Sequence, residues 1–207
     1  FAKKYRNMDI NFWKKILWSD ESKFNLKSSD GAKKVWRKKG EAYKLSCMKG
    51  TVKFGGGNIM VWGSMAWKGV GKLAFIDSKM DAPLYREILK NNLKSSARKL
   101  RLGNSYIFQQ DNDPKHTAKD TTKWFTDNSV EVLEWPAQSP DLNPIEHLWA
   151  ILDRKIGDRS LRKKEELKEA VTAAWAKITP EETKSLVESM PRRCEAVIQA
   201  KGGPTKY

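Results

Sequence analysis

The stretch FQQDNDPKHTAK, residues 108–119, places two aspartates, a proline, a lysine and a histidine directly behind an aromatic run. Residues 106–111 have the aromatic and aliphatic content of a short strand that ends at Asp111. Residues 114–128 predict a helix that starts at a proline. Acid is concentrated here, because residues 101–150 contain eight Asp and Glu against four Lys and Arg. A carboxylate delivered by a strand to the start of a helix is consistent with an α/β protein whose functional site is acidic.

The rest of the chain is basic. Across 207 residues the formal net charge is +15 and the isoelectric point is near 9.7. Clustered Lys and Arg bind polyanions by releasing the counterions that phosphates hold, so nucleic acid is the first expected partner and an anionic membrane surface the second. The hydrophobic content of 39%, with nine Trp, is enough to fill the core of one large domain or two small ones.

Several classes of protein are disfavoured by the residues that the chain lacks. The two cysteines, Cys47 and Cys194, lie far apart and no signal peptide is visible, which disfavours a disulfide framework and favours a reducing compartment. With only two histidines, no zinc-site spacing is present. No apolar run is long enough to span a membrane, and of the two polyanionic partners DNA is the one expected, with no membrane. The chain begins at Phe1 rather than Met, as a fragment would.

The order of predicted elements is that of a mixed α/β layer structure. Residues 12–26 predict a strand on which Asp20 shares one face with apolar neighbours. Residues 27–57 form a Lys-rich and Gly-rich excursion, interpreted as a functional loop or hairpin arm. Residues 58–67 and 72–78 predict a hairpin joined through KGVG, followed by a helix that Asp81 caps.

The C-terminal half continues the alternation of strands and helices. Residues 130–136 predict a strand, and the loop AQSPDLNP follows at 137–144. A helix begins at Pro144 and carries one apolar stripe at helical spacing. From residue 164 onward two further helical stretches are expected, broken at Pro180.

Three carboxylates have notable positions: Asp20 in the first strand, Asp111 at the end of a later strand, and Glu146 at the start of a helix. Each also has an ordinary interpretation. Glu146 fits a capping box with Asn143, Asp20 fits a half-exposed strand edge, and Asp113 fits a turn before proline. If the three converged, each pair at ~4 Å would repel by about 4 kcal/mol at an effective dielectric near 20, so cations would have to lie between them.

The nature of the ligands would then select the ion. Ligands that are all oxygen favour Mg²⁺, or Mn²⁺ in its place, over zinc. Two such ions roughly 3.5 to 4 Å apart would activate the attacking oxygen and stabilise the leaving oxygen in phosphoryl transfer. Convergence itself remains a hypothesis at the level of sequence.

The motifs LWSDES, VWRKKGE, FGGGNIMVWG, QQDNDPKHTAK and LEWPAQSPDLNPIEHLWAILDRKI together resemble the catalytic domain of Tc/mariner DNA transposases, most of all the Sleeping Beauty type. The family pattern is Asp, Asp and Glu with 34 residues between the last two, and 34 residues separate Asp111 from Glu146. The resemblance covers nearly the whole chain, and its motifs occur in the family's order.

The resemblance implies a ribonuclease-H-like fold of the retroviral-integrase type, a mixed five-stranded sheet flanked by helices, spanning residues 1–207 as one catalytic domain. Asp20, Asp111 and Glu146 match the metal-binding triad, which would hold two Mg²⁺ ions. Residues 27–57 resemble the family's clamp loop and glycine-rich strip. The N-terminal helix-turn-helix modules of the family, and its nuclear localisation signal, have no counterpart here.

The same resemblance suggests supporting roles around the triad. Lys115 and His116 match positions near DNA, with a solvated lysine and an ordinary polar histidine as the alternative. Phosphate contacts from the clamp are expected from Arg37, Lys38 and Lys39, with a solvated charge run as the alternative. Three polar residues are expected to support the ligands or form turns rather than bind metal: Asn112, Asp113 and Asn143. Three tryptophans are expected to be scaffold: Trp18, Trp135 and Trp149.

The activity implied is cut-and-paste transposition in the nucleus, with metal-dependent cleavage of double-stranded DNA at terminal inverted repeats and strand transfer into TA sites. The family's synaptic complex is a homodimer, while the isolated domain could be monomeric. Two alternatives remain open from the sequence: a non-catalytic DNA-binding relic of a transposase, and a ribonuclease-H-like nuclease.

Overall fold

The computed structural model describes residues 1–26, 57–157, 161 and 163–207. The expected clamp loop, with Arg37, Lys38 and Lys39, lies outside the described residues. Within the described part of the chain, no helix combines the length and apolar character needed to cross a membrane.

A five-stranded mixed sheet forms the centre of the molecule, in the order β3-β2-β1-β4-β5. Its strands are β1 (Ile16–Asn25), β2 (Asn58–Ala66), β3 (Gly69–Ile76), β4 (Ile107–Gln109) and β5 (Glu131–Val132). The first three strands are antiparallel, and β4 and β5 run parallel to β1. The expected mixed five-stranded sheet is therefore confirmed, with β1 and β4 as neighbours.

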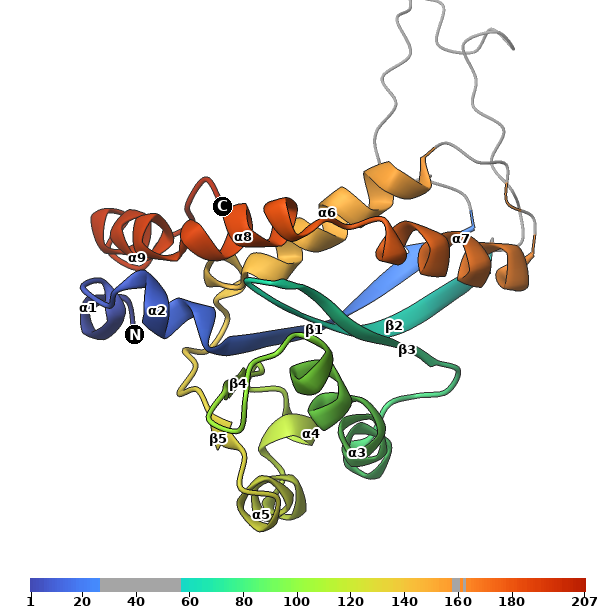
Figure 1. Cartoon of the computed structure of the whole chain (residues 1–207), viewed down its shortest axis with the longest axis horizontal. Coiled ribbons are helices and arrows are strands. Elements are labelled where there is room, and N and C mark those ends of the chain that lie inside the picture. The colour runs from blue at the N-terminus through green and yellow to red at the C-terminus, as the bar shows by residue number, and fades with distance from the viewer. Residues whose placement is uncertain (27–56, 158–160, 162) are drawn as a thin grey trace, which may run out of the picture.

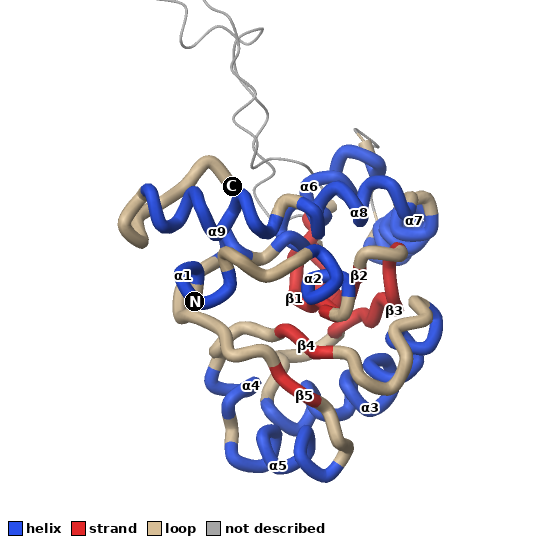
Figure 2. Tube along the Cα trace, turned by 60° about the vertical axis from the view of Figure 1, so that its left-hand side comes forward, coloured by secondary structure: helices blue, strands red, loops and turns tan. Residues whose placement is uncertain are grey.

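Helices cover both faces of this sheet (Figure 1). One face carries α3 (Ala82–Lys99), α4 (Pro114–Thr117) and α5 (Lys119–Asp127). The other carries α6 (Pro144–Ile156), α7 (Lys164–Ala176), α8 (Pro180–Glu188) and α9 (Met190–Gln199). The short helices α1 (Ala2–Tyr5) and α2 (Ile10–Lys14) lie beside the C-terminal helices, as Figure 2 shows from a second side.

Alternation along β1 builds a separate core on each face. Ile16 and Trp18 are fully buried in the cluster shared with α6 to α9, while Leu17 between them is buried in the cluster shared with α3. Successive side chains of a strand point to opposite faces, so one strand supplies both cores. The same alternation places Asp20 toward α6 and Glu21 toward α4.

Several predicted boundaries were wrong, each for a local reason. The first strand starts at Ile16, not at residue 12, because Asp9 caps α2 by accepting the Phe12 N–H at 2.9 Å. The hairpin strand β3 begins at Gly69, within the predicted KGVG connection. The strand that precedes the acidic motif ends at Gln109, so Asp111 lies two residues beyond it.

The predicted helices also divide further than expected. The helix over 114–128 is two helices, because Ala118 takes an extended conformation with φ −55° and ψ 143°. The last helical stretch is likewise two helices, with Pro191 in the first turn of α9. Proline cannot donate the backbone bond that a continuous helix needs there. The helix capped by Asp81, which accepts the Leu84 N–H at 2.9 Å, is as predicted.

Candidate active site

The three predicted carboxylates line one cavity of about 320 Å³. Asp20 comes from the middle of β1, Asp111 from the loop after β4, and Glu146 from the first turn of α6. Because β1 and β4 are parallel neighbours, the loop leaving β4 lies beside the middle of β1. The N-terminus of α6 closes the remaining side, with Asn143 also lining the cavity.

A buried tryptophan holds Asp20. The Trp149 Nε1–H donates to Asp20 Oδ2 at 3.0 Å, and the Trp149 ring stacks on Trp175 at 5.4 Å between centroids. Gly63 on β2 makes room for this ring, since a Cβ at that position would lie 2.5 Å from it. Burial, followed by the charges of Glu146 and Glu21, raises the pKa of Asp20 well above its usual value. Trp149 opposes that rise and fixes the carboxyl group in one orientation.

The helix cap positions Glu146. Asn143 caps α6 by accepting the Ile145 N–H at 3.4 Å, and its amide donates to the Ser19 carbonyl at 3.4 Å. The loop is thereby tied to β1 one residue from Asp20. Helix α6 has Asn143 as its side-chain cap but no capping box with Glu146, so the expected capping box is confirmed for Asn143 and wrong for Glu146. Burial, and next the charge of Asp111, raise the pKa of Glu146.

Asp111 is held in a different way, by a charged partner. Its Oδ1 lies 2.5 Å from His116 Nδ1 and accepts the Asp113 N–H at 3.0 Å, while about half of its side chain stays exposed. The His116 hydrogen bond lowers the pKa of Asp111. Burial alone would lower the pKa of His116, but the contacts with Asp111 and Glu21 outweigh it and raise that pKa to about 9. The pair therefore consists of an imidazolium and an ionised carboxylate at neutral pH.

The two expected DNA contacts beside Asp111 are engaged by carboxylates. Lys115 Nζ lies 2.6 Å from Asp113 and 3.6 Å from Glu21, and His116 Nε2 lies 3.4 Å from Glu21. The His116 side chain is only 4% exposed. This geometry does not favour a direct contact between His116 and DNA, because both cations are held against carboxylates of the fold.

The polar residues expected to support the ligands bind backbone groups. The Asn112 amide donates to the Trp135 carbonyl at 2.8 Å, which joins the loop after β4 to the far wall of the cavity. Asp113 caps α4 by accepting the Lys115 N–H at 3.0 Å. Together with Asn143, these residues fix the loops that carry the carboxylates.

A buried arginine holds the loop before α6 from behind. Arg193 is 1% exposed, and its guanidinium donates to the Asp141 carbonyl at 2.6 Å and to Ser189 Oγ at 2.7 Å. Thr205 donates both its N–H and its hydroxyl to the Asp141 carboxylate, each at 2.7 Å. Helix α9 and the C-terminal segment therefore support the loop from which Glu146 emerges.

Sequence reasoning missed Glu21 and Tyr85, and for Trp149 it predicted a scaffold role but not the hydrogen bond to Asp20. Glu21 follows Asp20 on β1, so strand alternation places it on the opposite face of the sheet. Its contact with His116 lies on that face. Trp149 lies one helical turn after Glu146, a spacing that puts two side chains on one face. The Tyr85 ring packs 4.0 Å from the His116 ring, and its hydroxyl donates to Gln110 at 2.7 Å. No local pattern marked that contact.

In the part of the chain that the structure describes, no three His, Cys, Asp or Glu side chains are arranged closely enough to enclose one ion. The carboxylates instead line a shared cavity, with Asp20 held by Trp149 and Asp111 turned toward His116. All three ligand candidates are oxygen donors, which suits hard divalent cations.

Residues 15–168 match the family described as DDE superfamily endonuclease. The transposable element Tcb1 transposase of Caenorhabditis briggsae is 45% identical over 208 residues, covering all of this chain and 76% of that protein. The Tc1 transposase of Caenorhabditis elegans is 43% identical over 207 residues, with the same coverage. The Mos1 mariner paired end complex with Mn superposes with a TM-score of 0.81 at 22% identity, covering 99% of this chain and 60% of that one.

The fold and the family match define the class as an endonuclease of the Asp-Asp-Glu type. The chain belongs to the DDE superfamily endonuclease family and, within it, is the catalytic domain of a Tc/mariner transposase. The expected family and the expected ribonuclease-H-like fold are thus confirmed. The chain spans about three quarters of the length of the Tcb1 and Tc1 transposases and 60% of the Mos1 chain.

Proposed function

We propose that this domain cleaves DNA at transposon ends and joins the freed 3′ ends to TA target sites, using Asp20, Asp111 and Glu146 to hold two divalent cations. The observation that carries the proposal is the meeting of these three carboxylates at one cavity in a DDE superfamily endonuclease. The transposases Tcb1 and Tc1, at 45% and 43% identity, support transposition as the activity.

The residues fit a divalent cation on electrostatic grounds. Asp20 and Glu146 line the same cavity, and burial raises the pKa of both carboxyls. Two carboxylates at ~4 Å repel by about 4 kcal/mol at an effective dielectric near 20, a repulsion that a cation between them reverses. Mg²⁺ is the proposed ion and Mn²⁺ its substitute, because all the donors are oxygens. When bound, such ions activate water and stabilise the leaving oxygen in phosphoryl transfer.

The chain's own residues then orient the ligands. Trp149 fixes the rotamer of Asp20, and Asn143 fixes the helix that carries Glu146. His116, as an imidazolium, keeps Asp111 ionised and ready to bind a cation. Partners that orient metal ligands typically contribute 10- to 100-fold in metal affinity, by order of magnitude.

The proposed substrates are double-stranded transposon ends and a TA-containing target, and the +15 net charge supports binding to their phosphates. Asn112, Asp113 and Asn143 are proposed to support the metal ligands. Lys115 is proposed to act near the DNA through Asp113 and Glu21, the carboxylates that it contacts. The whole protein is proposed to act as a homodimer in the nucleus, where its chromosomal target lies.

The test is strand transfer in vitro. The protein is incubated with pre-cleaved transposon ends and a TA duplex in Mg²⁺ or Mn²⁺, and joined products are resolved by electrophoresis. Joining by the wild type and none by Asp111→Asn is the expected result. Asp153→Asn, an exposed aspartate of α6, is the matched control and should join normally. Joining by Asp111→Asn would refute the proposed role of this carboxylate.

A further inference from the structure

Helix α3 carries a row of basic residues on its exposed surface. Lys90, Lys94 and Arg98 recur at intervals of four residues, and Arg101 follows just after the helix. At a rise of 1.5 Å per residue, the first three lie roughly 6 Å apart along one face. All four side chains are exposed. Within α3 itself the only acidic residue is Glu87.

The row ends in a cleft of about 640 Å³ between the C-terminal half of α3, the 101–104 turn and the residues after α5. Lys94, Arg98 and Arg101 line this cleft together with the amides Asn104 and Asn128, and no Asp or Glu among the described residues lines it. Lys94 donates to Asn128 at 3.2 Å, which fixes one cation against the wall.

Apart from the hydrogen bond between Lys94 and Asn128, the described contacts give the side chains of these three cations no role in the fold. Among the described residues, none of Lys94, Arg98 and Arg101 has a carboxylate within ion-pair distance. The nearby acid Asp127 is paired with Lys123 at 2.7 Å, and Glu131 is exposed on β5. Three like charges around an acid-free cleft repel one another, and a bound anion is what relieves that repulsion.

The cleft is connected to the candidate active site through α3. The other end of the helix carries Tyr85, which packs against His116 beneath Asp111. From Tyr85 to Arg98 the helix rises ~20 Å, about the length of six base pairs at 3.4 Å each. The cleft therefore lies about six base-pair steps along α3 from the contact beneath Asp111, and Figure 1 shows α3 below the sheet.

We infer that the cleft of Lys94, Arg98 and Arg101 is a second contact for the phosphodiester backbone of duplex DNA, remote from the catalytic carboxylates. The inference rests on the proposed function, because it takes DNA as the substrate of the same domain. The chemistry recognised is a run of backbone phosphates, and these belong either to the transposon end or to the target.

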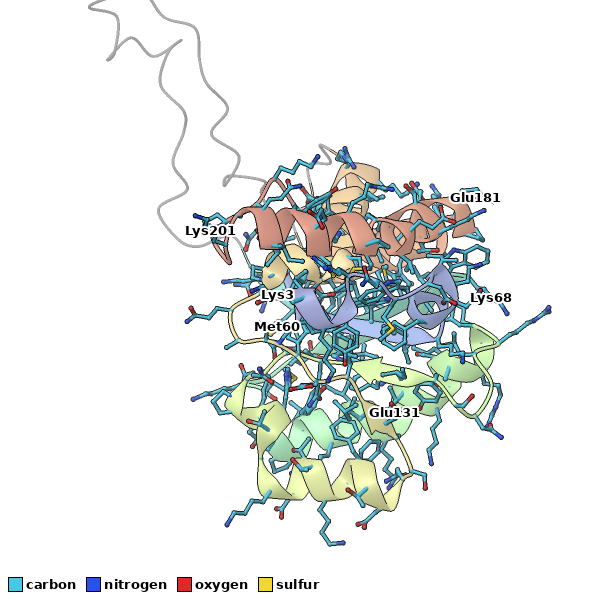
Figure 3. The ribbon with its side chains drawn as sticks, turned by 90° about the vertical axis from the view of Figure 1, so that its left-hand side faces the viewer. Lys3, Met60, Lys68, Glu131, Glu181 and Lys201 are labelled. Carbon is cyan, nitrogen blue, oxygen red and sulfur yellow. The ribbon has the colours of Figure 1, made fainter. Side chains whose placement is uncertain are left out.

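The test compares two sets of charge-removing variants. Lys94→Gln, Arg98→Gln and Arg101→Gln are combined in one protein, and Lys3→Gln, Lys177→Gln and Lys201→Gln in a control that loses equal charge from exposed positions elsewhere. Figure 3 labels Lys201 among the helices above the sheet, and Glu131, next to the cleft residue Val130, on the edge strand β5. Thermal unfolding confirms that both proteins fold, as expected for surface changes.

Binding to fluorescent duplexes is followed by anisotropy as salt is raised. The cleft variant should reduce the slope of log affinity against log salt by about 0.9 for each lost phosphate contact, up to about 2.7. The control should change the slope far less. Separate titrations use a pre-cleaved transposon end and a TA duplex. The DNA that the cleft variant binds more weakly is the one that occupies the cleft.

A cleft variant that follows the control on both duplexes would overturn the inference. The Asp111→Asn protein keeps the outcomes distinct, because it should bind DNA with the wild-type salt slope while failing to join strands. If Asp111→Asn joins strands, the proposed function fails. If it does not, and the cleft variant also matches the control, only the second contact fails.

Discussion

Replacing Trp149 by Phe should weaken Mn²⁺ binding without removing any ligand. The substitution keeps the aromatic packing against Trp175 but deletes the N–H that donates to Asp20 at 3.0 Å. A hydrogen bond to a charged group contributes about 1.5 to 3 kcal/mol, and it is strongest when Asp20 is ionised, as a ligand must be. At about 1.4 kcal/mol per factor of ten, the loss in affinity is roughly 10- to 100-fold.

The assay is calorimetric titration with Mn²⁺, and Trp175→Phe is the matched control. Trp175 undergoes the same change in the same stack, but its N–H donates to the Gly71 carbonyl at 3.2 Å rather than to Asp20. We expect both variants to be less stable than wild type and only Trp149→Phe to lose Mn²⁺ affinity. Equal Mn²⁺ affinities for the two variants would refute the idea that Trp149 positions Asp20.

The remaining predictions concern the residues that hold the carboxylates in place. His116, with its pKa raised from 6.5 to about 9, stabilises the metal-free fold fully below pH 6.5 and loses that contribution as pH rises through about 9. His116→Gln should abolish this decline in unfolding free energy, which denaturant titrations would measure as about 3 kcal/mol at most. An unchanged dependence of stability on pH would contradict the raised pKa of His116. Gly63→Ala should cost about 1 to 3 kcal/mol of unfolding free energy, because its Cβ would lie 2.5 Å from Trp149, and should also weaken Mn²⁺ binding. Thr205→Val should cost about 1 kcal/mol by removing a hydroxyl donor to Asp141, and Thr205→Ser should restore it; equal denaturation midpoints for the two would exclude that bond as a support.

The sheet could be predicted because its strands carry their own signals. On β1, Ile16 and Trp18 face one core and Leu17 faces the other. The aromatic run before Asp111 does form a strand, although its ends differ from the predicted ones. Helix caps were equally local, as at Asp81 and Asn143. The boundary errors arose where a local signal competes with another, as at residues 12–15, whose aromatics suit a strand but which follow the cap at Asp9.

The candidate site was only partly predictable. Its metal ligands could be identified from the sequence, whereas the residues that support them are brought there by tertiary packing. Asp20, Asp111 and Glu146 could be identified by spacing and resemblance. Whether Glu146 caps its own helix or faces Asp20 depends on how α6 packs against β1, which no local pattern states. The Glu21 contact with His116 joins residues far apart in sequence, so only the folded sheet reveals it.

The central claim is that Asp20, Asp111 and Glu146 together hold the cations that act on DNA. Titration of Mn²⁺ followed by electron paramagnetic resonance, in the presence of a pre-cleaved transposon end, counts the bound ions directly. We expect two ions per chain in the wild type and fewer in Asp20→Asn, Asp111→Asn and Glu146→Gln, with Asp153→Asn unchanged. Wild-type occupancy in the three carboxylate variants would contradict the claim.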